Sequence, residues 1–210
     1  MLATMQKQVD AGEYAFDRYV SIDRWASYHH QLALIFAQAP CSVLEVGIGD
    51  GIVGDQLRHA GIAYTSVDFA ADVHPDIVAP ITEIPVPDAS QDVVCAFEVL
   101  EHLPFEAFDT ALGELARISK KTALISLPHF GPSVRIEIKV PLVSRIRLAI
   151  KMPWPRKHVF NGQHYWEIGK RGFSQSRVRR ALEKHFIIEK EFVPFENQYH
   201  HFFALTKKIS

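Results

Sequence analysis

Three glycines, each two residues from the next, mark the stretch of this chain best suited to bind a charged ligand. Gly47, Gly49 and Gly51 follow the apolar run Ser42–Val46, and a helical pattern resumes at Ile52. Glycine is required where the backbone takes a positive φ, or where a ligand must approach the main chain without a Cβ in the way. The helix that follows presents unpaired N–H groups in its first turn. Strand, glycine turn and helix in this order predict the opening half of a nucleotide-binding βαβ unit.

Two acidic residues sharpen this prediction. Glu45 lies inside the otherwise apolar first strand, where an ionised carboxylate is costly unless another group pairs with it. Asp68 ends the next apolar run, Ala63–Val67, where an acidic side chain can bond both hydroxyls of a ribose. Both carboxylates therefore belong to strands that lead to the predicted ligand site.

The segments that carry these residues, LEVGIGDG and TSVD, resemble the class I S-adenosylmethionine-dependent methyltransferases of small-molecule type. A third segment, Phe97–Pro104 (FEVLEHLP), is similar to the segment after the fourth strand in many of these enzymes. The resemblance covers about residues 40–130 and implies S-adenosyl-L-methionine as the cofactor. Its methionine end would lie at the first strand and glycine turn, and its ribose at Asp68. The expected cofactor contacts are Glu45, Gly47, Gly49, Gly51, Asp68, Phe69, Ile81 and Glu98.

The sequence departs from this family at one cofactor position. Many relatives carry an acidic residue near the end of the third strand, which bonds the adenine amino group. Pro80 stands there in this chain, and it offers neither a carboxylate nor an N–H. We therefore expect the backbone of Ile81 or Thr82 to hold the adenine. The segment Asn161–Gly172, with the insertion before it, is similar to methyltransferases of bacterial surface-glycan pathways.

Strand and helix patterns alternate along most of the chain. The predicted strands are Ser42–Val46, Ala63–Asp68, Asp76–Ala79, Asp92–Phe97, Lys121–Leu127, His185–Pro194 and Gln198–Lys207, and the predicted helices are Ile22–Ala39, Gly51–Ala60, Phe105–Ser119 and Ser174–Lys184. We expect an α/β fold: a doubly wound, mostly parallel seven-stranded sheet that ends in an antiparallel β-hairpin, with helices on both faces. Residues 1–210 form one domain, with residues 1–40 as a helical cap and residues 128–172 as a substrate-side insertion or lid.

The insertion mixes basic and apolar residues between Arg135 and Lys157. Such a mixture can rest on an anionic membrane surface or close over a phosphorylated, anionic acceptor, in which Arg145 and Arg147 would contact phosphate. An ordinary amphipathic helix with a solvated face fits the same residues. The sequence leaves these three interpretations open.

Three histidines are candidates for a general base in the transfer reaction, with His129 and His164 ahead of His102. His102 and His129 fall just past the fourth and fifth strands, and ligands bind outside the carboxyl ends of such strands. His164 lies in a run of reactive and aromatic residues, His164–Glu167. A metal site at His158, His164 and Glu167 is a weaker interpretation, because their spacing matches no specific motif, and we predict no metal.

Charge divides the chain in two. Residues 1–116 carry four Lys and Arg against eighteen Asp and Glu, whereas residues 117–210 carry nineteen against six. The acidic half suits a cationic sulfonium cofactor and the basic half suits an anionic partner, although mutual attraction between the halves explains the split equally well. We expect no nucleic-acid partner, because the whole chain is not basic and no RNA-binding fold signature is visible. No signal peptide or membrane span is visible, so we expect a cytoplasmic protein.

The expected function is methyl transfer to a small-molecule acceptor, with a hydroxyl of a sugar or glycan precursor as the favoured atom. One alternative is an NAD(P)-dependent oxidoreductase, because Gly49–Gly54 is also a literal G-x-G-x-x-G. The other is a partner subunit that binds the cofactor without catalysis. The sequence does not specify an oligomeric state.

Overall fold

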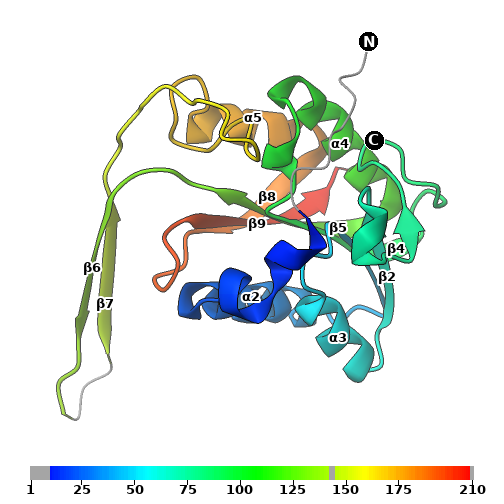
Figure 1. Cartoon of the computed structure of the whole chain (residues 1–210), viewed down its shortest axis with the longest axis horizontal. Helices are drawn as coiled ribbons and strands as arrows, with labels where there is room; N and C mark the ends of the chain where they lie inside the picture. The colour runs from blue at the N-terminus through cyan, green and yellow to red at the C-terminus, as the bar shows by residue number, and fades with distance from the viewer. Residues whose placement is uncertain (1–9, 142–144, 209–210) are drawn as a thin grey trace.

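A central sheet with helices on both faces forms the body of the protein, as the computed structural model in Figure 1 shows for residues 10–141 and 145–208. The strands of this sheet are β1 (Ser42–Val46), β2 (Ala63–Asp68), β3 (Ile77–Val78), β4 (Gln91–Phe97), β5 (Ser119–Pro128), β8 (Phe186–Phe192) and β9 (His200–Lys207). The helices are α1 (Phe16–Tyr19), α2 (Ile22–Phe36), α3 (Ile52–His59), α4 (Phe105–Ile118) and α5 (Gln175–His185), with 3-10 turns η1 (Ala11–Tyr14), η2 (Ala71–Val73) and η3 (Leu100–His102).

The strand order is β3-β2-β1-β4-β5-β9-β8. Strands β1 to β5 run parallel, whereas β9 is antiparallel to both β5 and β8. The predicted fold class, a mostly parallel sheet of seven strands that ends in an antiparallel hairpin, is therefore confirmed. The order reverses between β1 and β4, and in open α/β sheets ligands bind at this switch point, outside the carboxyl ends of the strands.

Alternation along the strands divides the core between the two faces of the sheet. On β1, Leu44 and Val46 pack with α4 and α5, whereas Val43 packs with α2 and α3. Each helix turns an apolar stripe to the sheet, and burial of such side chains provides most of the stability of the fold, at about 25 cal/mol per Å². Glu45 shares the α2 and α3 face with Val43, because side chains two apart on a strand point the same way.

Trp166 fixes the segment after the insertion to the body of the protein. Its ring is fully buried and lies 5.0 Å, centroid to centroid, from the rings of both Phe105 and Phe108. Its indole Nε1–H donates to the carbonyl of Leu103 at 3.1 Å, and the Tyr165 N–H donates to the carbonyl of Glu101 at 2.9 Å. Residues 163–168 are thereby held against η3, which decides where His164 lies.

The insertion contains a second, two-stranded sheet made of β6 (Ser133–Ile138) and β7 (Ile146–Lys151). These strands stand out from the body of the molecule as an arm (Figure 1). The amphipathic-helix interpretation of this stretch is wrong, because the apolar residues recur every second position, which is the period of a strand. Leu142 and Val143, which belong to the basic and apolar stretch, lie outside the described residues.

Two short helical turns and α2 precede the sheet, and residues 1–9 of the expected cap lie outside the described part of the chain. Helix α2 begins after Ser21, whose side chain accepts from the Arg24 N–H at 3.2 Å. It ends at Phe36, three residues before the predicted end, and the chain turns at Ala39, which has a φ of 47°. Within the described residues, no helix combines the length and the apolar character needed to cross a bilayer.

Candidate active site

The loop between β1 and α3 carries the three predicted glycines. Gly47, Gly49 and Gly51 have φ values of 78°, 54° and 78°, which is the left-handed region that favours glycine. A Cβ on Gly47 would lie 2.3 Å from Cγ2 of Val99, so at this position the loop also passes directly against the residue after Glu98. The glycine loop and the end of β4 therefore form adjoining walls of one site.

Asp68 stands beside this loop at the end of β2. Its Oδ2 accepts from the Ile48 N–H at 3.3 Å and its Oδ1 accepts from the Ala70 N–H at 2.9 Å. Burial raises the pKa of Asp68 even though these N–H donors oppose the shift. The next residue, Phe69, is half-buried and extends the same edge of the site.

Glu45 is buried, and the partner that the sequence requires for it is Tyr64. The Tyr64 hydroxyl donates to Oε2 of Glu45 at 2.5 Å. Burial raises the pKa of Glu45 to about 8, although the hydrogen bond from Tyr64 lowers it. Tyr64 also explains Gly54, because a Cβ there would lie 2.6–2.8 Å from the tyrosine ring and hydroxyl. The sequence analysis did not identify Tyr64 as a site residue. Its only signal in the sequence is a single tyrosine two positions before Ser66, which is buried on the same strand.

Aromatic residues of the N-terminal cap lie against the glycine loop. A Cβ on Gly49 would lie 3.7 Å from Cε1 of Tyr14 and 3.8 Å from the Tyr19 hydroxyl. The Tyr28 hydroxyl donates to Oδ2 of Asp50, within the same loop, at 2.5 Å. The cap thus lies over the loop that is expected to hold the cofactor.

Ile81, the expected adenine contact, is a core residue that is 2% exposed. Its side chain packs with the cluster on the α4 and α5 face, so only its backbone is available to a ligand. Pro80 before it is exposed and accepts a turn hydrogen bond from the Glu83 N–H at 3.0 Å.

Glu98 ends β4 with a φ of 54°, an uncommon conformation for a residue with a side chain. Burial raises the pKa of Glu98. Its Oε2 lies 3.6 Å from Nε2 of His200, which is buried on β9. The sequence analysis did not predict His200 as a site residue. His200 reaches this site because β9 pairs antiparallel with β5.

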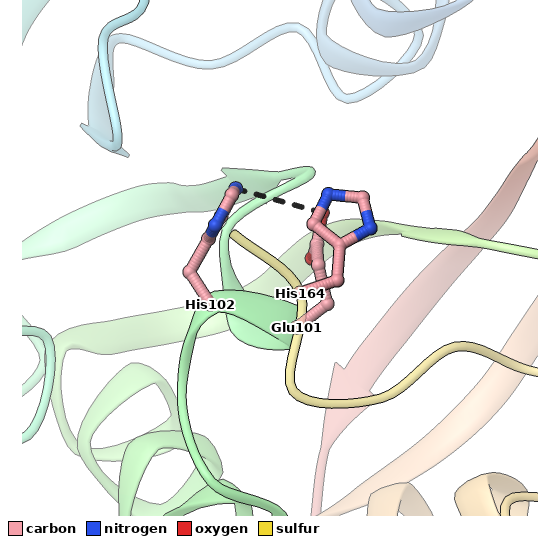
Figure 2. A group of neighbouring side chains, drawn as sticks. All are labelled: Glu101, His102 and His164. Atoms are coloured by element: carbon pink, nitrogen blue, oxygen red, sulfur yellow. Dashed lines mark ion pairs between the residues drawn. The ribbon is translucent and has the colours of Figure 1, made fainter. Parts of the chain in front are cut away.

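Glu101, His102 and His164 form the group that we name the Glu101 cluster (Figure 2). Oε1 of Glu101 lies 4.0 Å from Nε2 of His102 and 3.9 Å from Nε2 of His164. The ring centroids of the two histidines are 5.1 Å apart. Glu101 is completely buried, and burial together with the nearby Glu98 raises its pKa well above the ordinary value. Burial, and then the charge of His164, lowers the pKa of His102 to about 4.

Glu167 and Tyr199 flank His164 on its other side. Nδ1 of His164 lies 3.3 Å from Oε1 of Glu167 and 3.4 Å from the Tyr199 hydroxyl. Burial acts to raise the pKa of Glu167, but hydrogen bonds from His164 and Tyr199 leave it lowered. The sequence indicated Glu167 only through the weak metal interpretation, and it gave no signal for Tyr199.

His129 does not join this cluster. Its ring stacks on that of His201, with the two Nδ1 atoms 2.9 Å apart, and burial lowers the pKa of His129 to about 3. It lines a separate cavity of about 650 Å³ together with Lys151, Lys170, Arg171, Arg177 and Arg180. His158 is not part of the cluster either, and its Nε2 donates to the carbonyl oxygen of His164 at 2.8 Å. The fold therefore does not bring His158, His164 and Glu167 together as possible metal ligands. The group that it does bring together is the Glu101 cluster.

Comparison with known proteins gives one family match and several solved structures of the same fold. Residues 44–127 match the model of a family described as a methyltransferase domain. No relative was found among the curated proteins. One solved structure that is similar to this chain is Burkholderia thailandensis 1,6-didemethyltoxoflavin-N1-methyltransferase, bound to 1,6-didemethyltoxoflavin and S-adenosylhomocysteine. It is 17% identical, covers 94% of this chain and 85% of its own, and superposes with a TM-score of 0.63.

Two further structures share the fold. Magnesium protoporphyrin IX methyltransferase from Synechocystis, with bound S-adenosylmethionine, is 13% identical over 89% of this chain and 81% of its own, with a TM-score of 0.58. The N-methyltransferase NodS from Bradyrhizobium japonicum, in complex with S-adenosylhomocysteine, is 10% identical over 90% and 89%, with a TM-score of 0.59. At these identities the likeness establishes the fold.

Proposed function

We propose that this S-adenosylmethionine-dependent methyltransferase transfers the methyl group to a hydroxyl of a small-molecule acceptor, a sugar or glycan precursor. The methyltransferase-domain match and the cofactors bound to its structural neighbours support S-adenosylmethionine as the cofactor. The observation that carries the choice of a hydroxyl is the Glu101 cluster with Glu167 beside it, which adjoins the glycine loop through Glu98 and Val99. An amine acceptor would not require such a set of proton-accepting groups.

The chemistry of the cofactor explains this requirement. The sulfonium methyl is already activated, so the protein has mainly to align a nucleophile with it, which contributes up to about 7–11 kcal/mol. A neutral amine needs little else. A sugar hydroxyl is a weak nucleophile and gains about 10²–10⁴ in rate from a group that removes its proton. We assign this activation to the His102 and His164 pair and rank His129 behind them, because His201 occupies its Nδ1.

For the cofactor itself we propose contacts from Glu45, Gly47, Gly49, Gly51, Asp68, Phe69, Glu98 and the backbone of Ile81. The positive φ values of the loop glycines and the open space beside Gly51 support a backbone cradle at this point. Asp68 supports a ribose contact, since its carboxylate lies at the end of β2 and bonds the loop residue Ile48.

Replacing Asp68 with Ala should weaken binding of S-adenosylhomocysteine by about 1.5–3 kcal/mol, the value of hydrogen bonds to a charged group. Isothermal titration calorimetry measures this loss directly. The matched control is Asp55→Ala, which removes an exposed carboxylate on α3 and should bind as the unaltered protein does. Equal affinity of the two variants, or tighter binding of NAD than of S-adenosylhomocysteine, would remove the assignment and favour the oxidoreductase alternative.

The acceptor is proposed to be anionic, such as a nucleotide-linked or lipid-linked phosphorylated sugar. Arg145 and Arg147 support this less than the sequence indicated, because both pair with Glu137 and Arg147 also pairs with Glu196. Better support comes from the basic residues around the cavity beside His129, since Lys and Arg suit phosphate. The sequence resemblance of Asn161–Gly172 to surface-glycan methyltransferases supports an acceptor of this kind.

The arm formed by β6 and β7 is proposed to contact an anionic membrane. Its register places Val134, Ile136 and Ile138 opposite Ile150, Leu148 and Ile146. These six apolar side chains therefore share one face of the arm, and each is 45–55% exposed. The alternating positions include three basic residues, Arg135, Arg147 and Lys151, beside the acidic Glu137, and a mixed apolar and basic surface of this kind suits an anionic membrane.

Ile136→Ser should reduce binding to vesicles that contain anionic phospholipid by about tenfold, because it removes one aliphatic side chain from the buried surface. Co-sedimentation with vesicles measures the effect, and raising the salt concentration should weaken binding further. Ile187→Ser is the matched control, because Ile187 is similarly exposed on β8, away from the arm. Equal binding of the two variants would contradict a membrane role for the arm.

A further inference from the structure

The Glu101 cluster gathers three ligand atoms that come from distant parts of the sequence. One oxygen of Glu101 and one ring nitrogen each of His102 and His164 all lie within 4.8 Å of one another. Glu101 and His102 belong to η3, and His164 comes from the segment that Trp166 anchors against it. In Figure 2 both imidazoles are directed toward the carboxylate of Glu101.

Hydrogen bonding shows which lone pairs face the centre. Nδ1 of His102 lies 3.0 Å from the carbonyl oxygen of Gln163, and a carbonyl only accepts, so this nitrogen carries the proton. Nδ1 of His164 lies 3.3 Å from a carboxylate oxygen of Glu167 and is the donor there. In the neutral imidazoles the proton-free Nε2 atoms are then the ones nearest to Glu101.

Glu101 completes the set. Both of its carboxylate oxygens are buried, and neither has a hydrogen-bond partner within the described residues. Its distances of 3.9 and 4.0 Å from the two Nε2 atoms are too long for hydrogen bonds. Two imidazoles, both partly exposed, thus face a fully buried carboxyl group whose oxygens have no hydrogen-bond partner among the described residues, and a cation between them would satisfy that carboxylate.

We propose that Glu101, His102 and His164 bind a divalent transition-metal ion that coordinates the acceptor hydroxyl. The role toward the acceptor rests on the proposed function, whereas the binding of the ion does not. Two ligands at about 2.1 Å from one ion are about 3.4 Å apart in a tetrahedral arrangement. The observed separations of 3.9 and 4.0 Å from Glu101 are longer than this value, so binding of the ion requires the side chains to move closer together.

The surroundings match those of a metal centre. A histidine ligand usually donates its other ring N–H to a carboxylate or a backbone carbonyl, which fixes the ring and its tautomer. Glu167 does this for His164, and the carbonyl of Gln163 does it for His102. Two imidazoles and one carboxylate suit Zn²⁺, Mn²⁺, Fe²⁺ or Co²⁺, whereas Mg²⁺ and Ca²⁺ prefer oxygen ligands alone.

The ion would activate the acceptor as a Lewis acid. A hydroxyl that binds in an open coordination position has a lowered pKa and loses its proton to solvent. The oxygen lone pair then forms the new O–CH₃ bond while the S–CH₃ bond breaks. Both electrons of that bond return to sulfur, and the products are the methyl ether and neutral S-adenosylhomocysteine.

The test is metal binding by chelator-treated protein, measured with and without S-adenosylhomocysteine. Co²⁺ is followed by its visible absorption and Mn²⁺ by electron paramagnetic resonance. We expect stoichiometric binding by the unaltered protein and a loss of affinity of more than about 100-fold in His164→Ala and Glu101→Gln. Glu167→Gln, which changes only the partner of a ligand, should lose about 10–100-fold. His59→Ala is the matched control, because His59 is exposed on α3 and lies outside the cluster.

The outcomes separate this inference from the proposed function. Binding of S-adenosylhomocysteine, measured in every variant, reports whether the fold is intact. If the protein binds S-adenosylhomocysteine but neither Co²⁺ nor Mn²⁺ under either condition, the metal site is overturned and the methyltransferase proposal stands. Equal metal affinity in His164→Ala and His59→Ala also overturns it. Metal binding without any binding of S-adenosylhomocysteine would support the site and remove the proposed function.

Discussion

Replacing His164 with Ala is expected to lower kcat by about 10²–10⁴-fold, the usual value of a group that activates a hydroxyl. His164 is the histidine that contacts Glu167 and Tyr199 through Nδ1 and faces Glu101 through Nε2. The loss should appear whether His164 removes the proton itself or acts through a bound metal ion. Cofactor affinity should stay within about twofold, because the proposed cofactor contacts do not include His164.

The measurement is a transfer assay with radiolabelled S-adenosylmethionine against candidate sugar acceptors, and calorimetry with S-adenosylhomocysteine gives cofactor affinity. His59→Ala is the control and should retain full turnover. His129→Ala ranks the second candidate and should lose less than His164→Ala, since the His129 ring stacks on His201 and lies outside the Glu101 cluster. A loss below about tenfold in both His164→Ala and His129→Ala would mean that alignment of the acceptor alone carries the reaction or that the base lies elsewhere.

The second large effect concerns stability. Burial raises the pKa of Glu45 from 4.5 to about 8 in the folded protein, so the folded state holds its proton where the unfolded state has lost it. The contribution of Glu45 to the free energy of unfolding therefore falls as pH rises from about 4.5 to 8. Glu45→Gln removes this ionisation, and its stability relative to the unaltered protein should rise by up to about 1.4 kcal/mol per pH unit across that window.

Urea unfolding of both proteins between pH 5 and 8, without cofactor, measures this difference. Tyr64, Asp50, Arg58 and Cys95 are the ionisable groups that interact with Glu45 and are the same in both proteins. Asp92→Asn supplies a contrast of opposite sign. Lys120 and the N–H groups of Cys41 and Ser42 lower the pKa of Asp92 below its ordinary 3.8, so its stabilising effect is unchanged between pH 5 and 8 and is lost only below pH 3.8, and this variant is therefore compared with the unaltered protein from pH 5 downward. Parallel curves for Glu45→Gln and the unaltered protein would show that Glu45 is not buried as described.

The sequence determined the fold class and the ligand loop because both depend on local signals. The residues Ser42–Val46 and Ala63–Asp68 form strands at the predicted bounds, since short apolar runs between glycine turns have few alternatives. Gly47, Gly49 and Gly51 have the positive φ values that their spacing indicated, because only glycine adopts that conformation without strain. The terminal helix and hairpin are equally local, and their ends differ from the predicted ones by at most two residues.

Tertiary structure alone decided the partners of the buried charged groups and the place of the histidines. Tyr64 meets Glu45 only because β2 pairs with β1 in one register. His164 meets Glu101 and His102 across about sixty residues, because Trp166 packs into the α4 side of the core and holds the preceding chain against η3. His129 follows β5 as predicted, yet the pairing of β5 with β9 places it against His201. Contacts of this kind follow from packing and register between distant segments, and neither residue spacing nor periodicity encodes them.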